Sequence, residues 1–286
     1  SVSNALGTFL LRNLPISGST ALGFYGNPLQ IYGSLVSESS GTCGMVVPIL
    51  LGADAVFRTE QADLYIVSNV VNNGHTLSVE GNRQIIFMGG IAGSGGLTIS
   101  NSGTAILVAS NAYTGSTLVN GGTLQAMPAS LSGTAGLTVQ GSSTAMLNGA
   151  TGVLSPQTQN HQVLVTGAGA VLNSASALTI DGMSNSLAVS AGGLVRSADI
   201  ILGSDGNASH NAITVDGTDS RVNADNRLVM NTGTVNRLTV QNGGTVGASY
   251  TELHSTDSSI LVSGSGSVLT SGYILVSTSA QRDSME

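Results

Sequence analysis

VLVTGAGAVL at residues 163–172 is the first of five copies of one phrase in the stretch Val163–Ser277. The other copies are LAVSAGGLVR at 187–196, ITVDGTDSRVN at 213–223, LTVQNGGTVG at 238–247 and ILVSGSGSVL at 260–269. The third residue of every copy is a valine, and successive valines are separated by 24, 26, 25 and 22 residues. A period of this length is typical of a solenoid and not of a globular domain.

Each copy combines a strand pattern with a turn. In LTVQNGGTVG, Leu238 and Val240 point to one face and Thr239 to the other, because side chains alternate along a strand. The segment 242–244, Asn-Gly-Gly, accepts positive φ at low cost and forms the turn. A repeat of this length holds about three short strands and three turns. We therefore expect an all-β, right-handed parallel β-helix that forms a single elongated domain.

Stacking of such coils predicts two internal ladders of side chains. Neighbouring coils lie about 4.8 Å apart, so equivalent apolar residues lie over one another and cover each other from water. The first predicted ladder contains Val165, Val189, Val215, Val240 and Val262. The second predicted ladder contains Val171, Val195, Val222, Val246 and Val268.

The repeat extends upstream, with related phrases around Val79, Ile99, Val119 and Val139 at intervals of 20 residues. We assign residues 61–286 to the repeat-bearing β-helix and residues 1–60 to N-terminal coils or a cap that is continuous with it. In residues 1–60 the runs Leu6–Leu11, Leu29–Tyr32 and Met45–Leu51 are predicted strands. The first residues lack the charged start and sustained apolar run of a targeting segment, which indicates a processed or excised piece.

Composition excludes several classes of protein. Charged residues make up 8% of the chain, lysine is absent and the net charge is −7, whereas a nucleic-acid-binding protein needs a basic surface. Disorder is disfavoured because it requires low hydrophobicity and high charge. Cys43 is the sole cysteine, so no disulfide framework exists, and we expect it to be a small buried apolar residue.

Residues 95–125, GGLTISNSGTAILVASNAYTGSTLVNGGTLQ, carry a family resemblance. They resemble the autotransporter-associated β-strand repeat of Gram-negative type V secretion passengers. The matching elements are Gly95–Thr98, Gly103–Ile106, Asn111–Gly115 and Val119–Leu124. The family usually has Leu-Thr where this chain has Ala105-Ile106. The later phrases are similar to a related repeat of the same passengers, which include pertactin-like adhesins.

The resemblance implies a parallel β-helix that is exported across the outer membrane and displayed at the cell surface. Such passengers act in adhesion, autoaggregation or biofilm formation, often in virulence. The implied partners are a protein or glycan of a host surface or neighbouring cell, or further copies of the chain, with no nucleic acid. Membrane attachment would come only through a translocator domain, and the C-terminal sequence SAQRDSME shows no closing aromatic strand of one.

Two aspartate pairs are candidates for surface chemistry. Asp199 and Asp225 each lie ten residues after the valine at the third position of the repeated phrase in their coil, which we call the phrase valine. Asp181 and Asp205 each lie sixteen residues after theirs. Stacked carboxylates can bind Ca²⁺ or act as acid and base in sugar cleavage. Aspartate also favours turns because it caps its own backbone, and this simpler interpretation leads us to assign no catalytic, metal or cofactor-binding residue and no cofactor.

Other candidate motifs have simpler interpretations. His75, His161, His210 and His254 lack metal-ligand spacing and are expected in turns or on outer faces. Arg221, Arg227 and Arg237 recur near Asp219 and Asp225, which indicates exposed ion pairs. The glycine-rich segment Gly89–Gly96 lacks the Lys-Ser/Thr ending of a phosphate loop and is expected to form a turn.

Two other functions stay open. A polysaccharide lyase or hydrolase shares the β-helical architecture, although fold alone is poor evidence of function. Aromatic residues make up only 3% of the chain and lysine is absent, so few side chains are present to form a sugar-stacking platform. An inert spacer that holds another domain away from the membrane is the remaining alternative.

Overall fold

The computed structural model describes residues 8–11, 22–127, 130–148, 159–204, 206–277 and 284–285. Its named elements are all β-strands, and the pairings between them are parallel. They form a parallel β-solenoid of about 11 turns, which confirms the predicted all-β β-helix, while its handedness and the boundary at residue 60 stay predictions. Within the described ranges, no helix is long and apolar enough to cross a bilayer.

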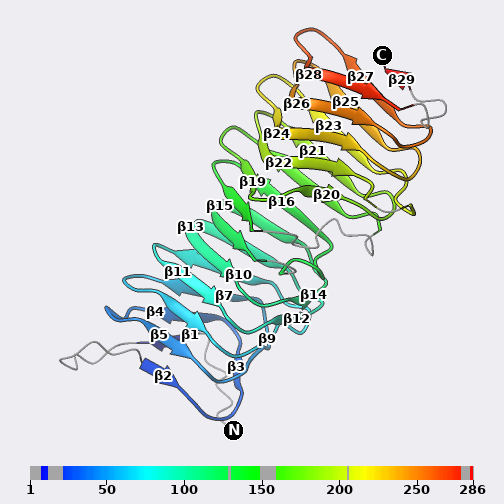
Figure 1. The fold of residues 1–286 in the computed structure, drawn as a ribbon. Helices are drawn as coiled ribbons and strands as arrows, with labels where there is room; N and C mark the ends of the chain where they lie inside the picture. The colour runs from blue at the N-terminus through cyan, green and yellow to red at the C-terminus, as the bar shows by residue number, and fades with distance from the viewer. Residues whose placement is uncertain are drawn as a thin grey trace. The chain divides into compact units, whose positions relative to one another are not determined.

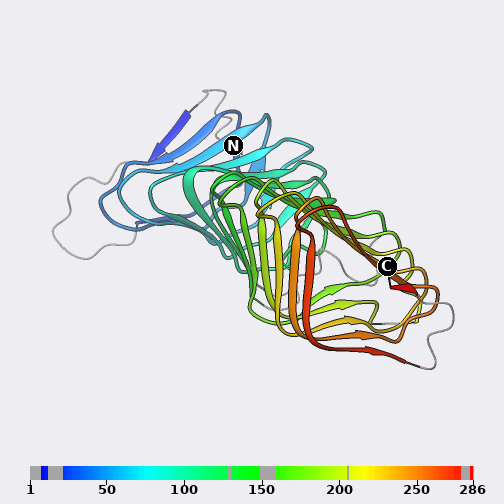
Figure 2. The ribbon, with the colours of Figure 1, turned by 90° about the horizontal axis from the view of Figure 1, so that it is seen from above.

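The chain divides into two compact units, Ser1–Ala135 and Gly136–Glu286, which we call unit 1 and unit 2. Within each unit the strand pairings run in three series, which we call sheets 1 to 3 in chain order, and each coil contributes to them in turn (Figure 1). Seen from above, the coils of unit 2 overlie one another (Figure 2). We describe each unit by itself.

Most strands of unit 1 are short and joined by tight corners, and its two long strands bend from sheet 1 into sheet 2. Sheet 1 contains β1 (Thr8–Leu11), β4 (Ser34–Ser37), β7 (Ala55–Thr59), β10 (Leu77–Gly81) and the first parts of β13 (Leu97–Leu107) and β15 (Thr117–Ala126). Sheet 2 contains β2 (Leu22–Phe24), β5 (Cys43–Met45), β8 (Leu64–Ile66), β11 (Gln84–Phe87) and the second parts of β13 and β15. Sheet 3 contains β3 (Leu29–Ile31), β6 (Ile49–Leu51), β9 (Val70–Val71), β12 (Ile91–Gly93) and β14 (Ala112–Tyr113).

Unit 2 has longer strands that bend from sheet 2 into sheet 3. Sheet 1 contains β16 (Gly136–Gln140), β18 (Gln162–Thr166), β21 (Ser186–Ser190), β23 (Ala212–Asp216), β25 (Arg237–Gln241), β27 (Ser259–Ser263) and β29 (Ser284–Met285). Sheet 2 contains β17 (Thr144–Leu147), β19 (Val171–Ser174) and the first halves of β22 (Leu194–Leu202), β24 (Arg221–Met230), β26 (Thr245–Leu253) and β28 (Val268–Val276). Sheet 3 contains β20 (Leu178–Ile180) and the second halves of those four strands.

The first predicted ladder is confirmed. Val165, Val189, Val215, Val240 and Val262 are register partners on successive strands of sheet 1. The first four are buried and Val262 is half-buried. Because the phrase begins at the same point of every coil, counting along the sequence locates this column correctly.

The second predicted ladder is wrong at two of its five positions. Val195, Val222 and Val246 are partners and are buried, but Leu172 and Leu269 occupy the remaining places. Val171 and Val268 instead pair with Leu194 and Thr245 and face outward. The turn between sheets 1 and 2 varies by one residue, and a slip of one residue reverses the face to which a strand side chain points.

Two predicted segments in unit 1 are divided differently in the structure. Met45–Leu51 is not one strand, since β5 ends at Met45 and β6 begins at Ile49, with Pro48 at the corner between them. Proline cannot donate a ladder hydrogen bond and is excluded from the middle of a sheet. Gly89–Gly96 is not a simple turn either, because it contains the short strand β12. Cys43 is fully buried, as predicted.

A column of buried asparagines fixes the corner that precedes sheet 1 in unit 2. The Asn185 N–H donates to the Asn211 side-chain oxygen at 2.9 Å, and the Asn211 N–H donates to the Asn236 side-chain oxygen at 3.1 Å. The Asn236 N–H donates in turn to the Ser258 hydroxyl at 3.0 Å. Each amide thus satisfies a buried backbone group of the preceding coil, which an apolar side chain would leave without a partner.

Candidate binding surfaces

The outer face of sheet 2 in unit 1 is apolar. Three successive coils carry runs of four apolar residues, LYIV at 64–67, IIFM at 85–88 and AILV at 105–108. The alternation of side chains buries half of each run in the core and points the other half outward. Continuous apolar runs are typical of strands that are covered on both faces. The sequence of these coils is therefore suited to a surface that meets another molecule.

We call Val67, Met88, Val108 and Met127 the apolar row. They follow one another in register, because the N–H of each donates to the carbonyl that precedes the equivalent residue of the previous coil, at 2.8–3.0 Å. Val67, Met88 and Val108 are 40%, 49% and 44% exposed. A second row, Tyr65, Ile86 and Ile106, lies beside it, in which Ile86 is buried at 8% exposure and the other two are half-buried. Contiguous exposed apolar side chains mark contact surfaces more often than single ones do.

The outer face of sheet 3 in unit 2 has a different chemistry. Leu228, Met230 and Leu253 are buried in the core, so the residues that alternate with them point outward. Asp199, Arg227, Tyr250 and Tyr273 are register partners on β22, β24, β26 and β28. We call these four residues the tyrosine row. A carboxylate, a guanidinium and two phenols are thereby aligned across neighbouring strands.

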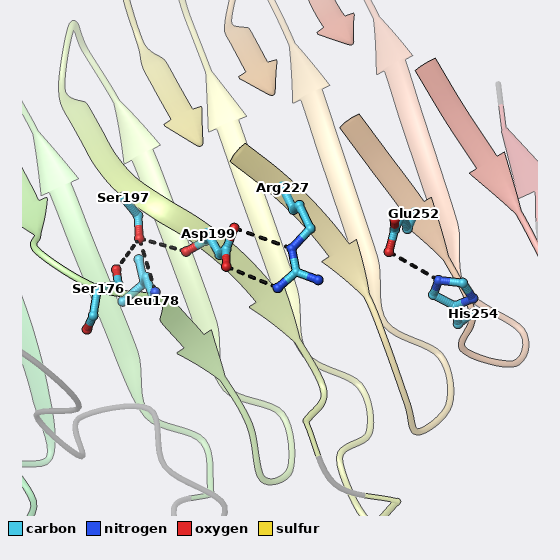
Figure 3. A network of polar contacts seen from close by, with 7 residues as sticks. All are labelled: Ser176, Leu178, Ser197, Asp199, Arg227, Glu252 and His254. Carbon is cyan, nitrogen blue, oxygen red and sulfur yellow. Dashed lines mark hydrogen bonds and ion pairs between the residues drawn. The ribbon is translucent and has the colours of Figure 1, made fainter. Parts of the chain in front are cut away.

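Asp199 and Arg227 form an ion pair at one end of the tyrosine row. Arg227 Nη2 lies 3.1 Å from Asp199 Oδ2, and Arg227 Nε lies 3.4 Å from Asp199 Oδ1 (Figure 3). The hydrogen bonds and the negative charge of Asp199 raise the pKa of Arg227 above its ordinary value. The guanidinium is oriented by two contacts, and the Arg227 side chain is still 43% exposed.

The predicted stacking of Asp199 on Asp225 is wrong. The register partner of Asp199 is Arg227, and the register shifts between Ser197 and Asp199 and between Ala224 and Arg227. One residue makes the corner in β22, whereas Asp225 and Asn226 make it in β24. Asp225 therefore lies at the bend and not in the row. Counting ten residues from the phrase valine missed this because the corner length varies.

The corner of β22 is held by one buried hydroxyl. The Ser197 oxygen lies 2.8 Å from the carbonyl oxygen of Ser176 and 2.6 Å from that of Asp199, and it accepts a hydrogen bond from the Leu178 N–H at 3.1 Å (Figure 3). These contacts tie β22 to the previous coil at the point where the strand bends. They fix the backbone from which Asp199 projects toward Arg227.

The second predicted aspartate pair is Asp181 with Asp205, and Asp205 lies outside the described residues. Asp181 is buried, and its carboxylate accepts hydrogen bonds from the N–H and the hydroxyl of Ser204. The carboxylate therefore satisfies the polar groups of the next coil at this corner.

The histidines and remaining ion pairs are spread over the surface. His254 Nε2 lies 3.3 Å from Glu252 Oε2 beside the tyrosine row (Figure 3), and His75 Nδ1 lies 3.8 Å from Asp54 Oδ1 in unit 1. Arg221 Nη2 lies 3.6 Å from Asp219 Oδ1, and both side chains are exposed, as predicted for this ion pair. Among the residues the structure describes, no group of three or more His, Cys, Asp or Glu side chains is placed to hold a metal ion.

Sequence reasoning missed the stacking of Tyr250 and Tyr273. Their ring centroids lie 5.1 Å apart with an interplanar angle of 20°. The two tyrosines are 23 residues apart, within the range of the repeat period, and this spacing was the signal that could have found them. A low count of aromatic residues does not exclude an aromatic platform, because the solenoid brings distant side chains together.

Comparison with known proteins gives no matching family model, no similar curated protein and no similar solved structure. The structure itself shows a parallel β-solenoid of about 11 turns.

Proposed function

We propose that this chain is a surface-exposed β-helical passenger region of a Gram-negative autotransporter that acts in adhesion, autoaggregation or biofilm formation. The apolar outer face of sheet 2 in unit 1 is the observation that carries the proposal. Its strands carry apolar side chains on both faces, although only the inner face meets the core of unit 1. A surface built in this way favours contact with a partner.

The repeat motif supports the same proposal. Gly95–Thr98 leads into β13, Asn111–Gly115 spans β14, and Val119–Leu124 lies within β15. Leu97 and Thr117 are register partners, so the quoted motif covers one full coil and the start of the next. The motif therefore corresponds to the structural repeat. Its partner would be a protein or glycan of a host surface or neighbouring cell, or a second copy of the chain.

The polysaccharide-cleaving alternative has lost one of the observations that motivated it. Asp199 lies beside Arg227 and not beside Asp225, so the structure does not supply that pair of carboxylates. The spacer alternative makes a different prediction, since a foreign β-helix of equal length would replace the chain without loss of function. Adhesion lost in that exchange would contradict the spacer.

Cells that display the chain on their surface provide the test. We expect them to sediment and to adhere to surfaces faster than cells with an empty anchor. Replacing Val67, Met88 and Val108 with serine is expected to abolish most of this effect, because it removes the apolar contact. The matched control replaces Met146, Met183 and Val235, three exposed apolar residues of unit 2, with serine. The proposal would be overturned if the unchanged chain, the unit 1 variant and the unit 2 control gave equal aggregation and adhesion. It would also be overturned if cells with the empty anchor aggregated and adhered as well as cells with the chain.

A further inference from the structure

The tyrosine row has the properties of a ligand platform. Tyr273 is 53% exposed and stacks on Tyr250, which is half-buried. Stacking and strand pairing hold both rings in place, so little side-chain freedom remains to be lost on binding. The guanidinium of Arg227 follows in the same row on the next strand and is fixed by Asp199. Fixed tyrosine and arginine side chains are frequent energetic centres of recognition surfaces.

The row runs across the strands and not along them. Its members lie on neighbouring strands, which are about 4.7–4.9 Å apart. A bound molecule would therefore lie along the stacking direction of unit 2 and meet one coil after another. This strand spacing is similar to the length of one ring in a linear oligosaccharide, so successive rings would meet successive coils.

The side chains combine the two chemistries that a sugar requires. The stacked tyrosine rings offer their apolar edges to the C–H groups of a sugar ring. Arg227, Asp199 and the Glu252–His254 pair offer planar donors and acceptors for adjacent hydroxyl groups.

Charge decides which class of sugar fits. Asp199 and Glu252 place two carboxylates beside the single guanidinium of Arg227, and the chain carries a net charge of −7. An acidic glycan would be repelled by this balance, whereas an uncharged one would not. We propose that the tyrosine row binds a neutral, linear oligosaccharide. This deepens the proposed adhesive function by naming the ligand class of one surface, and it concerns unit 2 only.

The test is titration calorimetry of the full chain with maltohexaose, cellohexaose and chitohexaose as neutral probes, and an oligogalacturonate hexamer as the acidic probe. We expect at least one neutral hexasaccharide to bind and the acidic hexamer to bind more weakly. Tyr273→Ala is expected to weaken binding about tenfold, which corresponds to about 1.4 kcal/mol. Tyr273→Phe retains the ring and is expected to retain binding.

The matched control is Tyr25→Ala, because Tyr25 is 79% exposed, belongs to unit 1 and is not a member of the row. We expect it to bind like the unchanged chain. No binding of any neutral hexasaccharide, tighter binding of the acidic hexamer, or an equal loss in the Tyr25 and Tyr273 variants would overturn the inference. The variants of unit 1 used in the cell assay leave this platform intact, so failure of one proposal is distinguishable from failure of the other.

Discussion

Sheet 2 of unit 1 and sheet 3 of unit 2 have equivalent interiors and different exteriors. Both point leucine, isoleucine and other apolar side chains inward. On the outside, unit 1 carries the apolar row, whereas unit 2 carries the tyrosine row with its ion pair. Stacking constrains the inner positions strictly, because each coil must cover the next. The outer positions are left to specify what the solenoid contacts.

The interior is where the largest effects are expected, in both units alike. Val240→Asp buries a carboxylate at a position that is 0% exposed, and we expect it to lower the free energy of unfolding by more than about 4 kcal/mol. Thr239→Asp, on the outer face, is expected to change it by about 0.5 kcal/mol or less. Urea unfolding measures both. Val79→Asp and Ser78→Asp are the equivalent pair in unit 1, and equal losses within either pair would contradict the assignment of faces.

Tyr113 distinguishes the core of unit 1. Its hydroxyl lies 2.5 Å from Thr117 Oγ1, and burial raises its pKa from 10.0 to about 12. The unfolded chain therefore releases this proton before the folded chain does, so stability is full below pH 10 and falls as pH rises from 10 to about 12.

The expected loss from Tyr113 is about 2 kcal/mol by pH 12. Tyr113→Phe removes it, so the stability difference between the two chains should be constant below pH 10 and shrink above it. Urea unfolding across this range is the measurement. A difference that does not change with pH would show that the phenol is not buried.

The asparagine column distinguishes the corners of unit 2. Asn211→Ala leaves the Asn185 N–H without its acceptor and removes one of the two N–H donors to the Gly182 carbonyl, which keeps the Ser209 N–H, and we expect a loss of about 1–3 kcal/mol. Asn223→Ala changes an exposed asparagine of the same unit and is expected to cost less than about 0.5 kcal/mol. Thermal and urea unfolding measure the loss of stability in both variants. Equal losses would contradict the structural role of the asparagine column.

The smallest effect on stability is expected on the outer face of unit 2. Arg227→Ala breaks an ion pair whose arginine is 43% exposed, and such pairs contribute about 0–1 kcal/mol. Arg221→Ala, at the exposed pair with Asp219, is the control. Unfolding at low and high salt measures both. A loss at Arg227 well above that at Arg221 would assign the tyrosine row a structural role.

The sequence was sufficient for the repeat and the first ladder because Val165 and its partners start each coil at a fixed point. It was insufficient for Leu172 and Arg227, since the turn before one and the corner before the other vary by a single residue. The apolar runs around Met88 were visible in the sequence, but their exposed half was not recognised. The pairing of Tyr250 with Tyr273 needed the exact register, which period counting does not supply.

The most direct test of the register is disulfide formation between engineered cysteines. Asp199→Cys with Arg227→Cys places two thiols on register partners, within the distance that a disulfide requires. Asp199→Cys with Asp225→Cys places them out of register, and Cys43 is buried and does not compete. Mass spectrometry after mild oxidation should detect the 199–227 cross-link in high yield and the 199–225 cross-link in low yield. The reverse pattern would contradict the coil register on which the tyrosine row depends.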